Sequence, residues 1–375
     1  MISKSKVGVI FGGLSSENEV SLATGRYVYS IVDRNRYDVY PLYMSSKTGK
    51  IYQIPDKLVI QNKTADIESR LEEAEYIPLE KLSEKCDVIF IALLGKYGED
   101  GVIQGILEML NIPYTGSGIL PSAVAMHKRV TKRLLQFNGI DVPHDYILKK
   151  SDWVENEELS IAEILKNLTP PVIVKPTREG SSVGVSYAND IDSMKKGINQ
   201  AFEWDTEILI EEYIKGTEFM CVVIGNKDPA AMLPTEVEFD GDIFTYEGKY
   251  MPGRARYHTP PRNHPPEIIQ RIRNTAVEAY KAVGIKGYGR VDGFILNDRI
   301  LINEVHTGTI MVPSSYVFQQ ASRADFGISK FKGGIKGGAK GKGFKGDVGL
   351  SPKQLVTTII DLAIDAHSNK KGTLT

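Results

Sequence analysis

The sequence predicts an α/β protein that folds into two or three domains. The chain has 375 residues, of which 42% are hydrophobic and 25% are charged, so it can form more than one buried core. In the first third of the chain, short apolar runs alternate with segments that have the character of helices. This alternation is typical of a parallel sheet with helices on both faces.

The first unit is expected to span residues 1–118. Its predicted strands are residues 7–11, 37–43 and 86–93, and its predicted helices are residues 17–32, 65–74 and 101–110. Gly12 and Gly13 connect the first strand to the first helix, with a serine as the N-terminal cap, in a turn of the kind that binds phosphate. The turn lacks the glycine pattern of dinucleotide-binding proteins. The turn-rich stretch PYTGSG marks the end of the unit.

Two further units are expected to follow. The second, residues 119–210, contains a predicted helix at 122–138, a strand that ends before a lysine, and a helix at 191–202. The third, residues 211–375, begins where the strand ILIEEY gives way to a Lys-Gly-Thr hinge and a second strand, EFMCVVIG. A hinge of this type can lay extended backbone along a flat ring.

The segment PVIVKPTREGSSVGVS carries the strongest chemical signal. Its apolar, β-branched run predicts a strand that ends at Lys175. The flexible GSSVG turn can direct backbone N–H groups and the hydroxyls of Ser181 and Ser182 toward a ligand. Lys175 would then lie beside a triphosphate as a point charge. The alternative is an ordinary hairpin with an exposed lysine, since glycine-rich turns are common.

Two carboxylates inside apolar runs form the second signal. Asp292 lies in GRVDGF and Glu304 in ILINEVH, two predicted strands joined by a turn at residues 297–298. Buried carboxylates are costly unless they are paired or bind a metal. Because side chains alternate along a strand, Arg290 shares a face with Asp292, and His306 shares one with Glu304. Near a triphosphate the carboxylates suit Mg²⁺, whereas the alternative is an internal salt bridge between Arg290 and Asp292.

Composition argues against several classes of protein. The formal net charge of −1 produces no global field that would attract nucleic acid or an anionic membrane. No stretch reaches the ~18 apolar residues of a membrane span, and we expect a cytoplasmic protein. Cys86 and Cys221 lie in apolar runs and are expected to be buried thiols. Four histidines show no zinc-binding spacing and are assigned to surface or packing roles: His144, His258, His264 and His367.

Seven motifs occur in order along nearly the whole chain. They are FGGLSSENEVSLA, GEDGVIQGILEMLNIPYTGSG, KPTREGSSVGVS, EEYIKGTEF, YEGKYMPGR, RVD, and INEVHT followed by PSSY. Any one of them would be weak, but together they argue against a chance origin. In this order they resemble the D-alanine–D-alanine ligases of the ATP-grasp superfamily. The resemblance implies an ATP-grasp fold of three α/β domains, with ATP between the central and C-terminal domains.

The resemblance also implies a reaction and its residues. ATP would phosphorylate one D-alanine, and the amine of a second D-alanine would attack the acyl phosphate, which gives D-alanyl-D-alanine for peptidoglycan. The nucleotide would contact Lys128, Lys175, Ser182, Glu211, Glu212, Tyr213, Ile214, Glu218 and Lys249, and two Mg²⁺ ions would bind Asp292, Glu304 and His306. Arg290 would neutralise charge on the transferring phosphoryl group and the tetrahedral intermediate. Of the remaining residues, Glu17 would bind the first substrate's ammonium, Ser315 the second substrate's carboxylate, and Ser181 and Tyr250 would hold the closed state.

Residues 246–250, YEGKY, resemble the family's closing loop, in which a lysine reaches the γ-phosphate and water is excluded. Tyr250 resembles ligases that accept D-alanine as the second substrate, which argues against a D-alanyl-D-lactate product. The alternative for this segment is a flexible surface turn. The family also suggests a homodimer.

Several positions depart from the family pattern. Leu94 stands in place of a histidine, and His127 in place of an aspartate. His306 replaces an asparagine, and Thr309 and Ile310 replace a Pro-Gly pair whose glycine N–H helps to form the oxyanion site. A β-branched residue restricts that backbone, and an imidazole favours a softer ion such as Mn²⁺. The alternative function is therefore an ATP-binding relative with impaired catalysis or a different second substrate.

Residues 330–349, KFKGGIKGGAKGKGFKGDVG, are an insertion relative to the family pattern. Repeated lysines repel one another and glycine lowers order, so we expect an exposed flexible loop. Contact of this loop with a polyanion is the weaker alternative.

Overall fold

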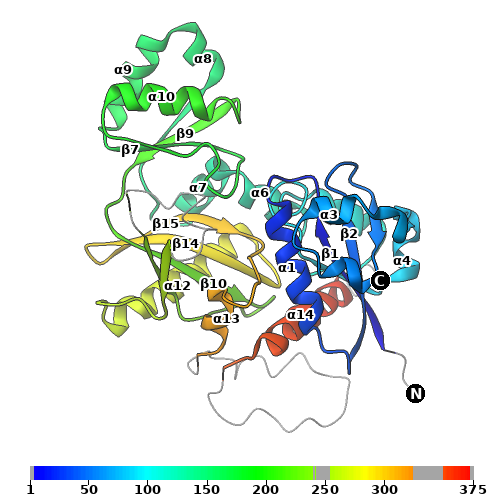
Figure 1. Ribbon diagram of the computed structural model, residues 1–375. Coiled ribbons are helices and arrows are strands. Elements are labelled where there is room, and N and C mark those ends of the chain that lie inside the picture. The colour runs from blue at the N-terminus through cyan, green and yellow to red at the C-terminus, as the bar shows by residue number, and fades with distance from the viewer. Residues whose placement is uncertain (1–3, 240, 242–253, 324–348, 372–375) are drawn as a thin grey trace.

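Figure 1 shows the computed structural model of the chain, which contains three β-sheets with flanking helices. The structure describes residues 4–239, 241, 254–323 and 349–371. The expected closing loop at residues 246–250 lies outside the described residues, as does the Lys- and Gly-rich segment except for Gly349. What the sequence predicts for these two segments stays a prediction.

The first sheet has the strand order β4-β3-β2-β1-β5. Its strands are β1 (Ser5–Gly12), β2 (Tyr37–Met44), β3 (Ile51–Gln53), β4 (Glu75–Ile77) and β5 (Val88–Ile91). Strand β1 pairs in parallel with both β2 and β5, which confirms the predicted parallel sheet. Strands β3 and β4, which were not predicted from the sequence, add an antiparallel edge.

Helices cover both faces of this sheet, as predicted. The helices are α1 (Asn18–Ile31) and α14 (Pro352–Lys371) on one face, and α4 (Leu82–Lys85) and α5 (Val102–Met109) on the other. Because side chains alternate along β1, Val9 packs with Leu22 of α1, whereas Ile10 packs with Ile103 of α5. The short helices α2 (Asp56–Val59), α3 (Thr64–Glu68), η1 (Leu71–Glu73) and η2 (Leu79–Lys81) complete the unit. Cys86 is a buried free thiol, as is Cys221 further along the chain.

Two predicted helices are interrupted. The helix predicted at residues 65–74 is wrong as one element, because Arg70, with φ −133° and ψ 23°, separates α3 from η1. The helix predicted at residues 122–138 is divided into α6 (Ile119–Met126) and α7 (Lys128–Phe137) by His127, with φ −99° and ψ 94°. The break makes Lys128 the first residue of α7, where its backbone N–H donates a 2.9 Å hydrogen bond to the carbonyl of Thr177.

The central sheet is antiparallel, with the order β6-β9-β7-β8. Its strands are β6 (Asp145–Lys149), β7 (Val172–Pro176), β8 (Ser186–Ala188) and β9 (Glu207–Glu212). The helices α8 (Lys150–Glu155), α9 (Glu157–Asn167) and α10 (Ile191–Ala201) lie above it in Figure 1. Apolar residues such as Val174 and Ile210 pack toward these helices, which leaves the opposite face for a ligand.

The third sheet is antiparallel and has the order β13-β12-β10-β14-β15, with β11 paired to β10. Its strands are β10 (Thr217–Ile224), β11 (Ala230–Ala231), β12 (Thr235–Phe239), β13 (Ala255–His258), β14 (Tyr288–Leu296) and β15 (Arg299–His306). Helix α12 (Pro266–Val283) covers one face, where Val291 and Ile302 pack with Ile272. A proline at its start and Gly284 at its end, with φ 82°, fit the usual ends of a helix.

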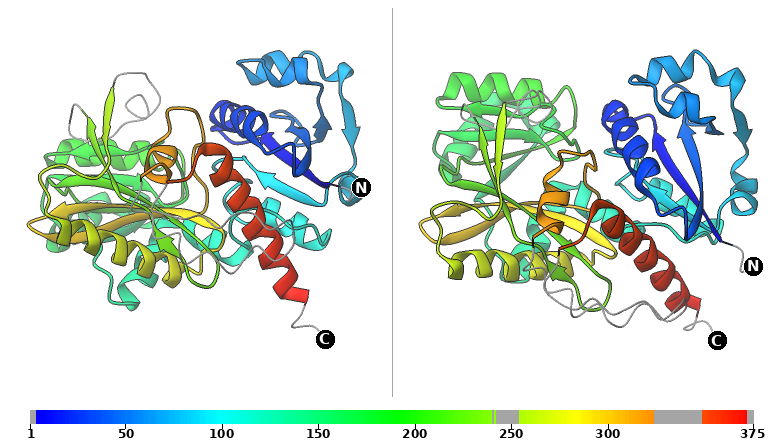
Figure 2. Two further views of the ribbon diagram at one scale, coloured as in Figure 1. Left: turned by 90° about the horizontal axis from the view of Figure 1, so that it is seen from below. Right: turned by 60° about the horizontal axis from the view of Figure 1, so that its bottom comes forward.

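The last helix, α14, returns to the first sheet. Figure 2 shows it running beside the N-terminal unit, and Asp361 accepts hydrogen bonds from Arg36 and from the hydroxyl of Tyr37. A short helix, α13 (Tyr316–Ala321), packs between α14 and the third sheet. No helix in the described part of the chain is long and apolar enough to cross a membrane.

Candidate active site

A cavity of about 380 Å³ lies between the central and C-terminal sheets. It gathers side chains from the start of α7, the end of β7, the serine-containing turn, the hinge after β9, and strands β10, β14 and β15. Its lining includes ten of the twelve residues predicted to contact a nucleotide or its metal, all except His306 and Lys249, which lies outside the described residues: Lys128, Lys175, Ser182, Glu211, Glu212, Tyr213, Ile214, Glu218, Asp292 and Glu304. We call it the larger cavity.

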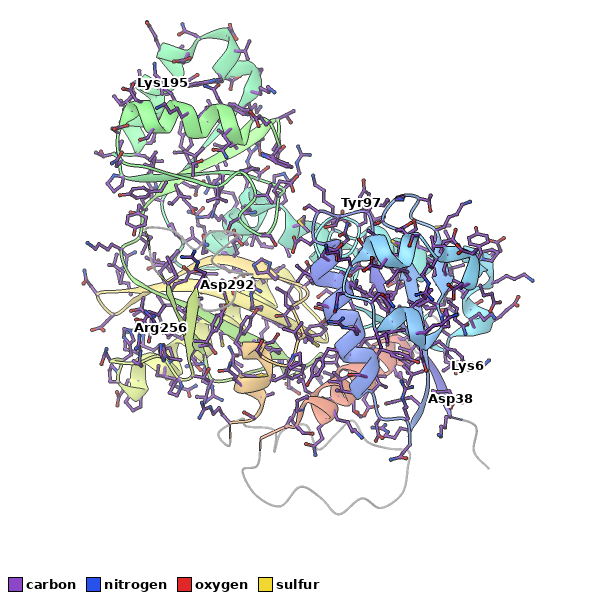
Figure 3. All side chains as sticks on the ribbon, in the orientation of Figure 1. Lys6, Asp38, Tyr97, Lys195, Arg256 and Asp292 are labelled. Carbon is purple, nitrogen blue, oxygen red and sulfur yellow. The ribbon has the colours of Figure 1, made fainter. Side chains whose placement is uncertain are left out.

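A smaller cavity of about 110 Å³ adjoins the larger one and reaches toward the N-terminal sheet. Its lining includes Glu17, which precedes α1, and Arg290 and His306 from the third sheet. The two cavities share Lys128, Glu179, Gly180, Ser181, Met220, Asn303 and Glu304. Figure 3 labels Asp292 near the middle of the molecule, where the central sheet approaches the third sheet. The two cavities therefore share a wall and lie next to each other.

Lys175 is buried at the end of β7, with only 3% of its surface exposed. Its Nζ atom lies 2.6 Å from Oε1 of Glu211, donates a 3.0 Å hydrogen bond to Oδ1 of Asn303, and lies 3.7 Å from Glu304. Burial alone would lower the pKa of Lys175, but the two carboxylates outweigh it and raise the pKa. The side chain therefore remains a cation, and the alternative of an exposed lysine is wrong. The other oxygen of Glu211 lies 2.6 Å from Nζ of Lys132.

The turn after β7 has the geometry of a ligand-binding loop. Ser181 and Ser182 have φ values of 50° and 61°, in the left-handed region that few non-glycine residues adopt. A Cβ atom at Gly180 would lie 2.5 Å from Oε1 of Glu17, so a glycine here lets that carboxylate approach the turn. The turn therefore links the N-terminal unit to both cavities.

Asp205 fixes the base of this turn. Its carboxylate accepts hydrogen bonds from the hydroxyl of Thr177 at 2.8 Å and from the backbone N–H of Arg178 at 3.1 Å, and it pairs with the guanidinium of Arg178 at 2.5 Å. Burial would raise the pKa of Asp205, but these bonds outweigh it and lower the pKa to about 2.

The hinge after β9 packs against strand β14 of the third sheet. A Cβ atom at Gly216 would lie 2.4 Å from the carbonyl oxygen of Ile295, so only glycine permits this close approach. The ring of Tyr213 meets that of Tyr187 edge-on, with their centroids 4.9 Å apart. Glu218 follows on β10 and lines the same cavity.

Strands β14 and β15 place their charged residues on one face. Asp292 pairs with Glu304, and Arg290 pairs with His306, which confirms the predicted shared faces. The register shifts between Asp292 and Gly293, a β-bulge that leaves Asn303 without an opposite partner. Because of this bulge, the consecutive residues Asn303 and Glu304 both line the cavities.

The charged side chains at this face lie close together and shift one another's pKa values. The Nε2 atom of His306 lies 3.3 Å from Oδ2 of Asp292 and 3.2 Å from Oε2 of Glu304. Burial and Arg290 lower the pKa of His306, but the two carboxylates outweigh them and raise it. Burial would raise the pKa of Glu304, but Lys128, His306 and Lys175 hold it well below its usual range. Both carboxylates are therefore ionised at neutral pH.

The carboxylates of Asp292 and Glu304 suit Mg²⁺ only if a bound ligand supplies further oxygen atoms. Within residues 4–239, 241, 254–323 and 349–371, no three His, Cys, Asp or Glu side chains form a group that could hold a metal ion. Mg²⁺, however, usually takes one or two carboxylates and completes its shell with phosphate oxygens and waters. Asp292 and Glu304 supply two such carboxylates beside the buried Lys175, so the residues fit this ion.

Arg290 is held by two neighbours. Its Nε and Nη2 atoms donate to the carboxylate of Asp292 at 2.7 Å, so the internal salt bridge considered from the sequence is present. Its Nη1 atom donates a 2.7 Å hydrogen bond to the hydroxyl of Tyr316, which lies 2.9 Å from Oγ1 of Thr309. The guanidinium therefore has a fixed orientation at the wall of the smaller cavity.

Three predicted site residues are not gathered in the cavities. Lys249 and Tyr250 lie outside the described residues. Ser315 lines neither cavity; its hydroxyl accepts a 2.9 Å hydrogen bond from the backbone N–H of Val312, at the start of α13. Its predicted contact with a substrate carboxylate stays a prediction.

Three further residues at the site were not predicted from the sequence: Lys132, Asn303 and Glu99. Lys132 lies four residues after Lys128 on α7, and this helical spacing was an available signal. Asn303 gave no signal, because its exposure to the cavities depends on the bulge. Glu99 accepts a 2.8 Å hydrogen bond from the N–H of Gly95, and burial raises its pKa, with a smaller contribution from Glu17.

Comparison with known proteins gives a consistent match. A family model described as the D-ala D-ala ligase N-terminus matches residues 6–117, and one described as the D-ala D-ala ligase C-terminus matches residues 134–330. The chain is 38% identical to the D-alanine–D-alanine ligase of Carboxydothermus hydrogenoformans over 326 residues, which cover 86% of this chain and 94% of that protein.

Two solved structures extend the match. The VanG D-Ala:D-Ser ligase of Enterococcus faecalis superposes with a TM-score of 0.79 at 30% identity, over 96% of this chain and all of that one. The D-alanine–D-alanine ligase of Bacillus anthracis complexed with ATP gives a TM-score of 0.69 at 26% identity, over 98% of this chain and 99% of that one.

Proposed function

Since this chain belongs to the D-alanine–D-alanine ligase family, whose reaction joins two D-alanines with ATP, we propose how its two cavities divide that reaction. The chain has the family's ATP-grasp fold, and its product is D-alanyl-D-alanine for the cell wall. In the proposal, ATP occupies the larger cavity and the two amino acids meet in the smaller one. The observation that carries this division is that Glu304 and Lys128 line both cavities.

We assign the larger cavity to the nucleotide. Lys175 and Lys128 would bind the phosphates, and this is supported by their burial beside the carboxylates of Glu211 and Glu304. The hydroxyl of Ser182 would add a neutral contact from the turn. The residues of the hinge, Glu211, Glu212, Tyr213 and Ile214, would border the adenine, and Glu218 would accept hydrogen bonds from the ribose.

We assign the smaller cavity to the amino acids. Glu17 would pair with the ammonium of the first D-alanine, and Ser181, which lies in the turn beside it, would help to close the site. Arg290 would stabilise negative charge on the transferring phosphoryl group and on the tetrahedral intermediate. The second D-alanine would approach from the side of Tyr257 and Tyr316.

We propose that Asp292 and Glu304 bind two Mg²⁺ ions together with ATP. When bound, these ions would neutralise charge on the phosphates as the terminal group transfers. His306 is the predicted third ligand, and the two carboxylates beside it raise its pKa, which favours the protonated form of the imidazole. It would have to lose its proton before binding a metal such as Mn²⁺.

Further parts of the proposal concern the whole molecule. We propose three domains, residues 1–118, 119–210 and 211–375, because each contains one sheet, although α14 of the third packs on the first. The Lys- and Gly-rich insertion would belong to the third. A homodimer and a cytoplasmic location are also proposed, the latter because the reaction consumes ATP.

A different second substrate is the alternative, and two observations favour it. The VanG D-Ala:D-Ser ligase is similar to this chain over the entire length of the VanG structure. Thr309 and Ile310 in place of Pro-Gly also alter the wall of the smaller cavity.

Phosphate release with ATP and magnesium tests the proposal. D-alanine as the only amino acid should support phosphate release, whereas D-serine as the only amino acid should support none. A dipeptide that contains serine as the main product from an equal mixture would favour the alternative. ATP binding without release in either case would indicate impaired catalysis.

A further inference from the structure

Among the described residues, the guanidinium of Arg290 leaves two of its hydrogens without an acceptor. Its Nε and Nη2 atoms donate to Asp292, and one hydrogen of Nη1 is donated to the hydroxyl of Tyr316. A guanidinium carries five N–H donors and no acceptor, so Tyr316 must accept in this contact. The remaining N–H groups, one on each terminal nitrogen, are available for a charge in the smaller cavity, which Arg290 lines.

The hydroxyls of Tyr316 and Thr309 share one hydrogen bond, 2.9 Å long. Each hydroxyl has a single hydrogen. If Tyr316 donates to Thr309, the hydrogen of Thr309 is left over, and if Thr309 donates, the hydrogen of Tyr316 is left over. Both residues line the smaller cavity and are more than 90% buried. Burial raises the pKa of Tyr316, so its phenol keeps its proton at neutral pH.

We propose that Thr309 and Tyr316 form a hydroxyl pair that orients Arg290 and donates one hydrogen bond to the oxyanion of the tetrahedral intermediate. This inference rests on the proposed role of Arg290 and deepens it. The oxyanion would then receive the guanidinium and a neutral hydroxyl from the same wall of the cavity.

The step that the pair would assist is addition of the amine to the acyl phosphate. The amine nitrogen forms a bond to the carbonyl carbon, and the π electron pair of the carbonyl moves onto its oxygen. When that pair returns, the bond between the carbon and the phosphate oxygen breaks, and phosphate leaves. The proton of the amine is released to water. Because the hydroxyl hydrogen only bridges to the oxyanion, the pair returns to its starting state.

The hydroxyl pair lies where this sequence departs from the family pattern. At Thr309 and Ile310 the family pattern has Pro-Gly, whose glycine N–H serves the oxyanion. A proline has no side-chain hydroxyl, so the pair exists only because this chain has threonine there. We infer that the hydroxyl pair supplements the donor set at the position where the backbone has become bulkier.

Four variants separate a chemical role from a structural one. Tyr316→Phe and Thr309→Val remove one hydroxyl each at nearly constant volume, and each should lower kcat on the order of 10²-fold, the usual effect of a lost oxyanion donor. Thr309→Ser retains the hydroxyl, and its kcat should stay within about 3-fold of that of the parent, since it keeps the interaction made in the transition state.

Tyr280→Phe is the matched control, because it removes a buried hydroxyl that donates to Gly225 on the α12 side of the third sheet. It should lower Tm but leave kcat unchanged.

The KM for ATP should not move in any of these variants, because none touches the larger cavity. A second measurement uses a phosphinate analogue of D-alanyl-D-alanine, whose tetrahedral P–O⁻ group stands in for the oxyanion. Calorimetry should show on the order of 10-fold weaker binding of the analogue to Tyr316→Phe and Thr309→Val, as expected for one lost charge-assisted hydrogen bond.

The outcomes are distinct. If the parent is active and both hydroxyl deletions keep its kcat and its affinity for the phosphinate, the inference is wrong while the proposed function stands. An equal loss in Thr309→Ser and Thr309→Val also overturns it, because side-chain shape would then be the cause. If the parent neither releases phosphate with D-alanine nor binds the phosphinate, the proposed function fails and this inference fails with it.

Discussion

The ammonium nitrogen of Lys175 lies 2.6 Å from a carboxylate oxygen of Glu211, and both side chains are at least 95% buried. The other oxygen of Glu211 lies 2.6 Å from Lys132, whose side chain is fully buried. One carboxylate thus fixes two lysines and forms a triad with them. Burial lowers the pKa of Lys132, whereas Glu211 and Glu304 raise the pKa of Lys175. Lys175, which lines the larger cavity, therefore supplies a fixed positive charge that suits a triphosphate.

Replacing Lys175 with methionine should weaken ATP binding. The change removes one charge-assisted contact with the phosphates, which is worth about 1.5–3 kcal/mol, or roughly 10- to 100-fold in Kd. Calorimetry with a non-hydrolysable ATP analogue measures it. Lys195→Met is the control, since Lys195 lies on the far side of the central unit and pairs only with Glu157 among the described residues (Figure 3). Equal affinities in the two variants would remove Lys175 from the phosphate site.

Lys132→Met tests the triad as a unit of stability. Removing one partner of a buried ion pair costs about 3–5 kcal/mol, because it leaves a buried charge incompletely compensated. Urea unfolding should therefore show a marked loss. In contrast, Arg129→Met on the same helix removes a half-exposed pair with Glu207 and should cost less than about 1 kcal/mol. A similar loss in both variants would mean that the buried triad has no special role in stability.

Glu304→Gln should abolish turnover more completely than it weakens nucleotide binding. Glu304 borders both cavities, and its carboxylate is proposed to bind the metal as charge develops during transfer. Glu218→Gln is the contrasting variant, because Glu218 lines only the larger cavity and should change the KM for ATP first. Comparing phosphate release with calorimetry separates the two effects. Parallel losses of binding and turnover in Glu304→Gln would point to a structural role.

Asp205 should make stability depend on pH in acid. Its pKa is lowered to about 2 in the folded protein, against about 3.9 for an unperturbed aspartate. A group with a lowered folded pKa contributes stability that is present above the unfolded pKa and is lost as pH falls through the folded one. The parent should thus be more stable than Asp205→Asn by about 2 kcal/mol at pH 7. This difference should shrink between pH 4 and pH 2 in urea titrations, and a constant difference would contradict the assignment.

Local sequence patterns predicted much of the fold. The parallel strands β1, β2 and β5 and the helix α10 follow from apolar runs and helical spacing, and the structure confirms them. The break at His127 was not predicted, because it accompanies a hydrogen bond of Lys128 to Thr177, a residue of the same unit that is distant in the sequence. Similarly, β3 and β4 are short edge strands whose formation depends on their neighbours rather than on their own sequence.

Site residues could be predicted where the local sequence around a single residue was informative. Contacts between residues that are distant in the sequence could not be predicted. Lys175, Asp292 and Glu304 could be found because charge inside an apolar strand needs an explanation. The contact between Arg290 and Tyr316 could not, because it joins β14 to a helix that follows 20 residues after that strand and depends on the tertiary fold. The roles of these residues remain proposals.

The most direct test of the central claim is phosphate release by the parent protein with ATP, Mg²⁺ and D-alanine, combined with mass spectrometry of the product. We expect release that requires D-alanine, is absent with L-alanine, and yields one phosphate for each D-alanyl-D-alanine formed. ATP binding without release that depends on D-alanine, or release without the dipeptide, would contradict it.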